Sequence, residues 1–172
     1  ILRAGDRAQQ YLAALRSVGT VPAARQRTDS HAFVAALADT ANALCRPAKL
    51  HFVLQEQWQG QFLCAAPELS RALENMLDNA VRYTPAGGTV TLTISKADGD
   101  VSFTVTDTGP GFTPEALHKA GQFLYTDAAR PCNGHQGLGL YLARSVAQAH
   151  VGKLVLANTG TGAQVQLCLP MQ

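Results

Sequence analysis

The chain has 172 residues, 47% of them hydrophobic and 15% charged, and a formal net charge of +2 at pH 7. Its length is that of one ordinary domain, and its composition excludes an intrinsically disordered chain. So small a net charge gives no electrostatic reason to expect nucleic-acid binding, and no apolar run approaches the roughly 18 residues of a membrane-spanning helix.

The N-terminal part of the chain is predicted to be a helix followed by a linker. Residues 1–18 are Ala-rich and weakly amphipathic, which favours a helix, and residues 20–29 contain Pro22 and have the composition of a linker. Because the sequence does not begin with Met, we expect a fragment of a longer protein or a processed chain.

A second helix is predicted over residues 31–46, with Ser30 as its N-cap and Pro47 as its end. Its apolar residues recur at helical spacing and are expected to face a core. They are Phe33, Leu37, Ala41 and Leu44.

The remainder of the chain is predicted to mix strands and helices around one long, glycine-rich connection at residues 108–136. The predicted strands are residues 50–55, 61–64, 89–96, 101–107, 153–158 and 163–169. The predicted helices are residues 67–83, a short segment after Pro114, and residues 138–150. Mostly antiparallel strands with helices over one face predict a two-layer α/β sandwich.

The four cysteines lie far apart in the sequence and lack the spacing of zinc ligands, so we expect reduced thiols. They are Cys45, Cys64, Cys132 and Cys168.

The predicted helix at residues 67–83 has two contrasting faces. Its apolar residues form one face, and Arg71, Asn75, Asn79 and Arg82 form the opposite one. Asn is a poor helix former, so two of them one turn apart are unusual. Their amide oxygens suit a hard cation and their NH₂ groups suit phosphate oxygens, although a chance polar face is an equal alternative.

Two glycine-containing motifs follow. Asp107-Thr-Gly-Pro-Gly111 ends a predicted strand, where a carboxylate can accept a hydrogen bond from an exocyclic amine such as that of adenine. Taken alone, it is more often an ordinary turn. The run Gly134-His-Gln-Gly137-Leu-Gly139-Leu140 leads into a helix whose backbone N–H groups could bind phosphate, but it lacks the GK[ST] of a Walker A loop.

In this order and spacing, the motifs resemble the catalytic ATP-binding domain of bacterial sensor histidine kinases, within the gyrase–Hsp90–histidine kinase–MutL superfamily. The resemblance extends over residues 29–170. Residues 74–85 look like the family's N box, 107–112 like its G1 box, 137–146 like its G2 box, and 159–170 like its C-terminal hairpin.

The resemblance implies a Bergerat-type ATP-binding fold, with residues 113–136 as a mobile ATP lid that includes Phe123 and Tyr125. It also implies two parts of the chain. Residues 1–28 would be the remnant of a dimerisation and phosphoacceptor helix plus a linker, and residues 29–172 would be the catalytic domain.

Site roles follow from the same resemblance, with ATP and Mg²⁺ as cofactors. Asn75 and Asn79 would be the catalytic residues, with Asn79 coordinating the metal, and Asp107 would hold the adenine amine. The remaining nucleotide-binding residues would be Arg82, Tyr83, Gly109, Gly111, Phe112, Gln136, Gly137, Leu138 and Gly139.

Several positions depart from the family pattern. His135 replaces a glycine of the lid, Ala65 replaces a frequent Asp, Ala163 and Val165 replace a Thr and an aromatic residue, and Arg82 replaces a Lys. His135 affects the expected hinge of the lid, and none of the departures removes an essential nucleotide-contacting group.

The expected reaction is transfer of the γ-phosphoryl group to a histidine with little hydrolysis. The superfamily's ATPases carry a water-activating Glu where this chain has Asn75, and the neighbouring Glu74 points about 100° away on the helix. None of the five histidines lies in the family's acceptor context. They are His31, His51, His118, His135 and His150.

The resemblance implies two partners, the protein's own dimerisation and phosphoacceptor domain and a response regulator, and no nucleic acid. We expect a homodimeric parent, a monomeric fragment and a cytoplasmic domain, with membrane anchoring of the parent left open. Three alternatives remain, namely a degenerate nucleotide-binding regulatory module, an anti-sigma-type serine kinase, and an ATPase.

Overall fold

A five-stranded sheet with strand order β2-β4-β5-β7-β6 forms the centre of the computed structural model, which describes residues 24–122 and 137–171. The strands are β1 (Gln26–Asp29), β2 (His51–Glu56), β3 (Gln61–Cys64), β4 (Thr89–Ala97), β5 (Asp100–Asp107), β6 (Lys153–Asn158) and β7 (Ala163–Pro170). The helices are α2 (Ser30–Ala48), α3 (Ala66–Tyr83), α4 (Pro114–Lys119) and α5 (Gly139–Ala149).

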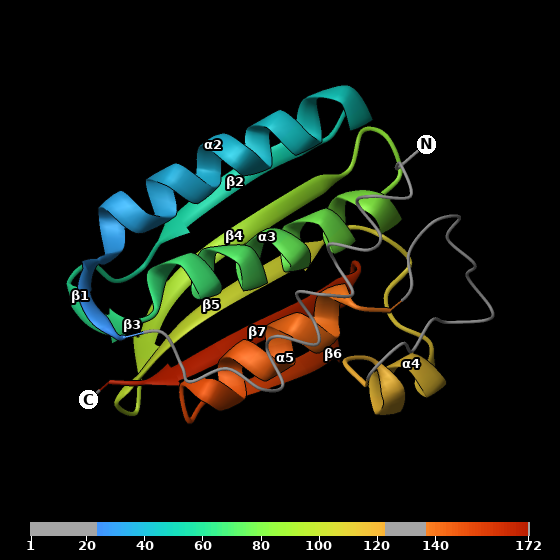
Figure 1. The fold of residues 1–172 in the computed structure, drawn as a ribbon. Helices are drawn as coiled ribbons and strands as arrows, with labels where there is room; N and C mark the ends of the chain where they lie inside the picture. Colours follow the sequence, from blue (N-terminus) through green and yellow to red (C-terminus); the bar gives the residue numbers. More distant parts are fainter. Residues whose placement is uncertain (1–23, 123–136, 172) are drawn as a thin grey trace, which may run out of the picture.

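The sheet is mixed and has one covered face. Strands β4, β5, β7 and β6 pair antiparallel, whereas β2 lies parallel to β4. Helices α2, α3 and α5 lie side by side over one face of this sheet (Figure 1). The predicted two-layer α/β sandwich is therefore confirmed.

The alternation of residue types along the strands determines which face is covered. In β4, Val90, Leu92 and Ile94 are completely buried, while the threonines between them stay half-buried on the opposite face. Leu92 and Ile94 stand opposite Val105 and Phe103 of β5, so apolar side chains line up across the strands. Burial of these rows against the helices provides the hydrophobic core.

The predicted linker at residues 20–29 is wrong over its last four residues, because Gln26–Asp29 form β1. This strand pairs antiparallel with β3, with Arg27 opposite Leu63, in a separate two-stranded sheet. Its sequence, QRTD, has no apolar alternation, so only the pairing reveals it as a strand. The predicted helix at residues 1–18 lies outside the described residues.

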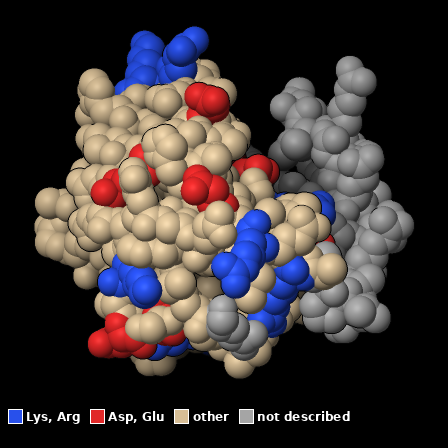
Figure 2. Space-filling model, turned by 90° about the vertical axis from the view of Figure 1, so that its left-hand side faces the viewer, with Lys and Arg blue, Asp and Glu red and all other residues tan. Residues whose placement is uncertain are grey.

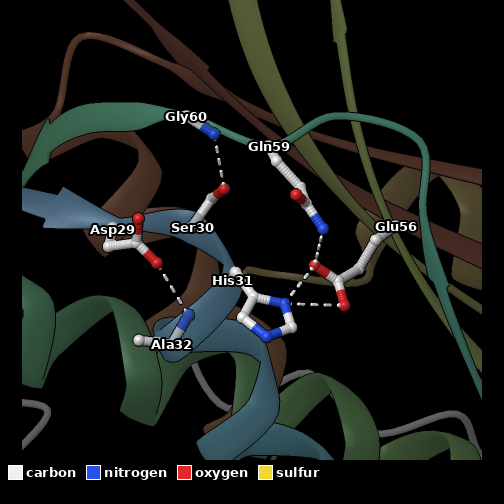
Figure 3. A network of polar contacts seen from close by, with 7 residues as sticks. All are labelled: Asp29, Ser30, His31, Ala32, Glu56, Gln59 and Gly60. Carbon is white, nitrogen blue, oxygen red and sulfur yellow. Dashed lines mark hydrogen bonds and ion pairs between the residues drawn. The ribbon is translucent and has the colours of Figure 1, made fainter.

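Helix α2 begins one residue earlier than predicted, and Asp29 is its N-cap. The Asp29 Oδ1 accepts a hydrogen bond from the Ala32 N–H at 2.9 Å. Ser30 is the first helical residue, and its Oγ accepts the Gly60 N–H at 2.9 Å while its own N–H donates to the Gly60 carbonyl at 2.9 Å (Figure 3). The start of the helix is thus joined to the turn before β3.

The end of α2 also differs from the prediction, because the helix passes through Pro47 and ends at Ala48. Lys49 adopts a left-handed conformation with φ of 56°, and its N–H and that of Leu50 return to carbonyls of the last turn. Pro47 therefore lies too close to the end to stop the helix earlier.

Charges of both signs are interspersed on the face that carries β1 and β3, and apolar or uncharged residues separate them (Figure 2). No single-sign field dominates this face, as the small net charge leads one to expect.

An exposed ion pair connects the first turn of α2 with the end of β2 (Figure 3). The His31 Nδ1 lies 2.9 Å from the Glu56 Oε2 and 3.1 Å from the Oε1, and the Gln59 Nε2 donates to the same Oε2 at 3.3 Å. The hydrogen bond and the charge of Glu56 favour the imidazolium and raise the pKa of His31 above its ordinary value.

We expect Glu56→Gln to lower the pKa of His31, because the substitution removes both the charge and the strongest acceptor. Since the folded-state pKa is raised, the stabilisation from this pair is fully present below the unfolded-state pKa and is lost as the pH rises through the folded value. An NMR titration of the imidazole C–H resonances measures the shift. Asp39→Asn, which removes an exposed charge elsewhere on α2, is the control and should leave the titration of His31 unchanged. An unchanged titration in Glu56→Gln would contradict the prediction.

Candidate functional site

The sequence motifs converge where the second half of α3 meets the first turn of α5. The two helices pack against each other along their length. A Cβ built on Gly139, the first residue of α5, would lie 3.7 Å from the Asn75 Cβ and 3.8 Å from its Oδ1. The start of α5 therefore lies directly against the polar face of α3.

The two asparagines of α3 present side-chain amides that no described residue engages. Asn75 and Asn79 are both half-buried, and no residue in the described ranges hydrogen-bonds to either amide. Asn42 of α2 differs, because its Nδ2 donates to the Ala38 carbonyl at 2.9 Å. Two half-buried amides one turn apart, without a partner among the described residues, are groups suited to a polar ligand.

The first turn of α5 adds backbone donors beside these amides. Gly137 has φ of 68°, a conformation that glycine adopts without strain, and no side chain caps the helix at Leu138. The Leu138 side chain is buried against Leu142, which holds the turn in place. The first N–H groups of an uncapped helix, together with its dipole, favour an anion at this end.

Asp107 forms a second part of the site, at the end of β5. Its side chain is buried, and its Oδ1 accepts the N–H of Gly109 at 2.8 Å and that of Ala163 at 3.3 Å. Within the described part of the chain, no hydrogen bond reaches the Oδ2. One oxygen thus holds the carboxylate in place, and the other remains able to accept a hydrogen bond.

Burial dominates the electrostatics of this carboxylate. Desolvation raises the pKa of Asp107, and the hydrogen bonds from Gly109 and Ala163 lower it by a smaller amount. The site therefore keeps a carboxyl group in a largely apolar setting, where a single hydrogen bond to a ligand is stronger than in water.

Two glycines allow the backbone to approach Asp107 closely. A Cβ on Gly109 would lie 2.8 Å from the Tyr83 carbonyl oxygen and 2.9 Å from the Asp107 Oδ1. A Cβ on Gly162, in the turn between β6 and β7, would overlap the Asp107 carbonyl. Side chains at these positions would displace the carboxylate or the end of α3.

Asn158 is a structural residue of the site that the sequence analysis missed. Its Oδ1 accepts the Phe112 N–H at 2.6 Å and its Nδ2 donates to the Phe112 carbonyl at 2.9 Å, which fixes the loop after β5. Gly111, with φ of 72°, leaves room for this amide. The partners are 46 residues apart, so no local sequence signal indicates the contact.

Arg82 and Tyr83 lie at the end of α3, and both are half-buried. The Arg82 Nη2 pairs with the Asp78 Oδ2 at 2.6 Å, so in this structure its guanidinium is held along α3. A phosphate contact by Arg82 and a nucleotide contact by Tyr83 stay predictions.

The end of the short α4 is attached to α5. The predicted helix after Pro114 is present, and the Arg144 Nη2 donates to the Ala120 carbonyl at 3.0 Å. Most of the predicted lid lies outside the described residues. This applies to Phe123, Tyr125, Cys132, His135 and Gln136.

The described residues contain no group of three or more His, Cys, Asp or Glu side chains that could hold a metal ion. Cys45, Cys64 and Cys168 are free and buried, as expected for reduced thiols. Residues 24–122 and 137–171 also include no helix that is long and apolar enough to cross a membrane.

Comparison with known proteins gives a family match over most of the chain. The family described as histidine kinase-, DNA gyrase B-, and HSP90-like ATPase matches residues 64–172. The sensor histidine kinase SpaK of Bacillus subtilis is 43% identical over 107 residues, which cover 60% of this chain and 23% of SpaK. The chain thus spans about a quarter of the length of this relative.

Solved structures show the same fold. The catalytic domain of the histidine kinase ThkA has a TM-score of 0.77 and 19% identity, and the match covers 86% of this chain and 95% of that domain. Full-length ShkA in complex with AMPPNP has a TM-score of 0.79 and 22% identity, with 99% of this chain and 40% of ShkA covered.

We expect Gly162→Ala to destabilise the fold, whereas Gly160→Ala should be neutral or slightly stabilising. The added methyl group overlaps the Asp107 backbone at position 162 but meets nothing within 4 Å at position 160 of the same turn. At position 162, overpacking of this kind destabilises the fold by about 1–3 kcal/mol. At position 160, replacing glycine by alanine restricts the unfolded chain and can stabilise the fold by about 0.4–1 kcal/mol. Urea denaturation measures both free energies of unfolding. Equal stability of the two variants would mean that the close approach to Asp107 is not restrictive.

Proposed function

The chain belongs to the family of histidine kinase-, DNA gyrase B- and HSP90-like ATPases, and we propose that it is the catalytic domain of a two-component sensor histidine kinase. In this role it binds Mg·ATP and donates the γ-phosphoryl group to a histidine on another domain. The main observation behind this proposal is the position of Asn75 and Asn79, whose amides have no partner among residues 24–122 and 137–171, beside the uncapped start of α5.

The phosphate groups of ATP fit this part of the site. The backbone N–H groups that follow Gly137 and Leu138 would donate to phosphate oxygens, as would the Nδ2 of Asn75. Such donors carry no net charge, so the site can hold a polyanion although the chain has a net charge of only +2. Gln136, Gly137 and Gly139 are proposed to contact phosphate through their backbone.

The adenine ring fits the pocket at Asp107. Its exocyclic amine would donate to the Oδ2, the oxygen that no described residue uses, while Gly109 and Gly111 leave space beside the ring. Guanine carries a carbonyl oxygen at the corresponding position and would face the carboxylate with an acceptor. The pocket should therefore discriminate ATP from GTP.

A Mg²⁺ ion fits the donor set of α3, with the Asn79 Oδ1 as its protein ligand. The absence of an acidic cluster from the described residues agrees with a metal held mainly by phosphate oxygens and water. Mg²⁺ binds in this way in many nucleotide sites, through one or two protein oxygens. When bound, it would neutralise charge on the transferring phosphoryl group.

The polar face of α3 favours transfer to a side chain over hydrolysis. Asn75 cannot take a proton from water, and the Glu74 carboxylate accepts the Ser70 hydroxyl at 3.0 Å, along its own side of the helix. An imidazole nitrogen of the acceptor would bond to the γ-phosphorus as the bond to the β–γ bridging oxygen breaks and ADP leaves.

The partners follow from this reaction. SpaK is named a sensor histidine kinase, and we propose for this chain the same context, with a dimerisation and phosphoacceptor domain and a response regulator. We further propose a cytoplasmic site of action, a homodimeric parent and a monomeric catalytic domain that starts near residue 29. The buried free thiols agree with a reducing compartment.

We expect Asn79→Asp and Asp107→Asn each to abolish Mg·ATP binding. The first places a negative charge beside the phosphates, and the second replaces the acceptor for the adenine amine by an amide that can also present a donor. Isothermal titration calorimetry measures the affinity. Asn42→Asp, the same change on an exposed helix position, should bind as the wild type does. Undiminished affinity in both site variants would rule out the proposed site.

We expect the full-length parent, incubated with γ-labelled ATP, to acquire a phosphate that acid removes and alkali does not, as phosphohistidine does. The chain alone should release phosphate slowly, because Asn75 stands at the position where a water-activating Glu would be needed and cannot take a proton from water. Acid-stable label would instead indicate a serine kinase, and rapid phosphate release an ATPase. Tight nucleotide binding without any labelled protein would indicate a regulatory module.

A further inference from the structure

His150 joins the end of α5 to the beginning of α3. The residue is 4% exposed, the Ala65 N–H donates to its Nε2 at 3.0 Å, and its Nδ1 lies 2.8 Å from the Val146 carbonyl oxygen. The bond to Ala65 is buried and connects residues that are 85 positions apart. It lies at the opposite end of α5 from Gly139, and no role in the function proposed above uses it.

The two partners determine the state of the ring. The Val146 carbonyl can only accept a hydrogen bond, so the Nδ1 carries the proton, and the Ala65 N–H can only donate, so the Nε2 must be bare. The neutral imidazole with its proton on Nδ1 satisfies both groups. Ala65 precedes the first turn of α3, which has no side-chain cap, so this N–H would otherwise be a buried donor without a partner.

Several contacts hold α5 in place, among them the bond from Arg144 to the Ala120 carbonyl and the packing of Leu140 and Val146 on the core. The two residues that α5 buries completely are Ala143 and Ala147. Methyl groups allow close approach but form only shallow ridges, which set the register of two helices weakly. The hydrogen bond from Ala65 to His150 adds a directional contact between the capping residues of α3 and α5.

The two ends of this helix pair have matched lengths. Ala65 and Asn75 are 10 residues apart on α3 and its cap, and Gly139 and His150 are 11 residues apart on α5 and its cap. At about 1.5 Å per residue, these distances are roughly 15 Å and 16.5 Å. The helix pair therefore has the bond between His150 and Ala65 at one end and the contact between Gly139 and Asn75 at the other, with nearly equal lengths of helix between them.

The backbone after His150 shows how firmly this end is held. Val151 is β-branched and 71% exposed, yet it adopts φ of 61°, which costs strain that only a well-determined surrounding structure maintains. Its N–H and that of Gly152 return to carbonyls of the last turn of α5. Gly152 itself packs so closely on the Cys168 carbonyl that a Cβ there would overlap it.

We propose that His150 is a positioning residue for the phosphate end of the nucleotide site. By accepting the Ala65 N–H, it fixes the register of α5 on α3 and so the distance between the first N–H groups of α5 and Asn75. The proposal rests on the binding of Mg·ATP proposed above. It predicts a specific effect, in which the loss of the bond weakens contacts to phosphate and leaves the adenine pocket at Asp107 intact.

The experiment compares two ligands in three variants. His150→Phe keeps a ring and removes the acceptor, His150→Gln keeps an acceptor, and Ala65→Pro removes the donor at a residue whose φ of −82° is close to that of proline. Calorimetry measures the affinity for Mg·ATP, and NMR shift titration measures that for adenosine. Val34→Ala, a destabilising core change in α2, is the control for a general loss of stability.

We expect His150→Phe and Ala65→Pro each to weaken Mg·ATP about tenfold, because each leaves a buried polar group unpaired or the register unset. The double variant should be no weaker than either one. His150→Gln should bind within about threefold of the wild type, and adenosine affinity should change less than about twofold in every variant. Val34→Ala should bind both ligands as the wild type does.

Wild-type affinity for Mg·ATP in His150→Phe would overturn the inference and leave the proposed function standing. Equal losses for ATP and adenosine would also overturn it, because they would mean a general structural role. If His150→Phe fails to fold, Ala65→Pro and His150→Gln decide by the same criteria. Failure of the wild-type chain to bind Mg·ATP would instead reject the proposed function itself.

Discussion

Helix α3 has to bury one face and keep the other open to a ligand, and the rest of the domain is arranged around that requirement. Leu69, Leu73 and Met76 are completely buried in the core below it. This burial supplies most of the free energy that orders the helix, since helices in proteins are stabilised mainly by packing of their apolar face. The opposite face can therefore carry Asn75 and Asn79, which are poor helix formers and have no hydrogen-bond partner among the described residues.

The groups around α3 divide the recognition of a nucleotide into two parts with different physics. At the start of α5, backbone donors and side-chain amides would face the phosphates in the proposed site, and none of them carries a full charge. At Asp107, a buried carboxyl group uses one oxygen to hold its own position and offers the other. Because the two parts belong to different elements, their relative position depends on how α5 and β5 pack against α3.

Much of the fold follows from patterns within single segments. The period of two in β4, the two faces of α3 and the placement of Asp107 at the end of a strand can all be predicted from local spacing. Strand β1 and the N-cap of α2 could not, because QRTD has no alternation and both Asp29 and Ser30 are good capping residues. The folded chain identifies Asp29 as the N-cap, because the side chain and the N–H of Ser30 are both bonded to Gly60.

The site divides in the same way. The residue types, namely two asparagines one turn apart, an aspartate after a strand and glycines before a helix, were determined by the sequence alone, since each motif lies within one segment. The tertiary structure decided which oxygen of Asp107 is engaged, that Arg82 pairs with Asp78, and that Asn158 and His150 hold distant segments together. The bonds of Asn158 and His150 join residues 46 and 85 positions apart. Contacts at such separations leave no periodic trace in a sequence, so only the folded chain reveals them.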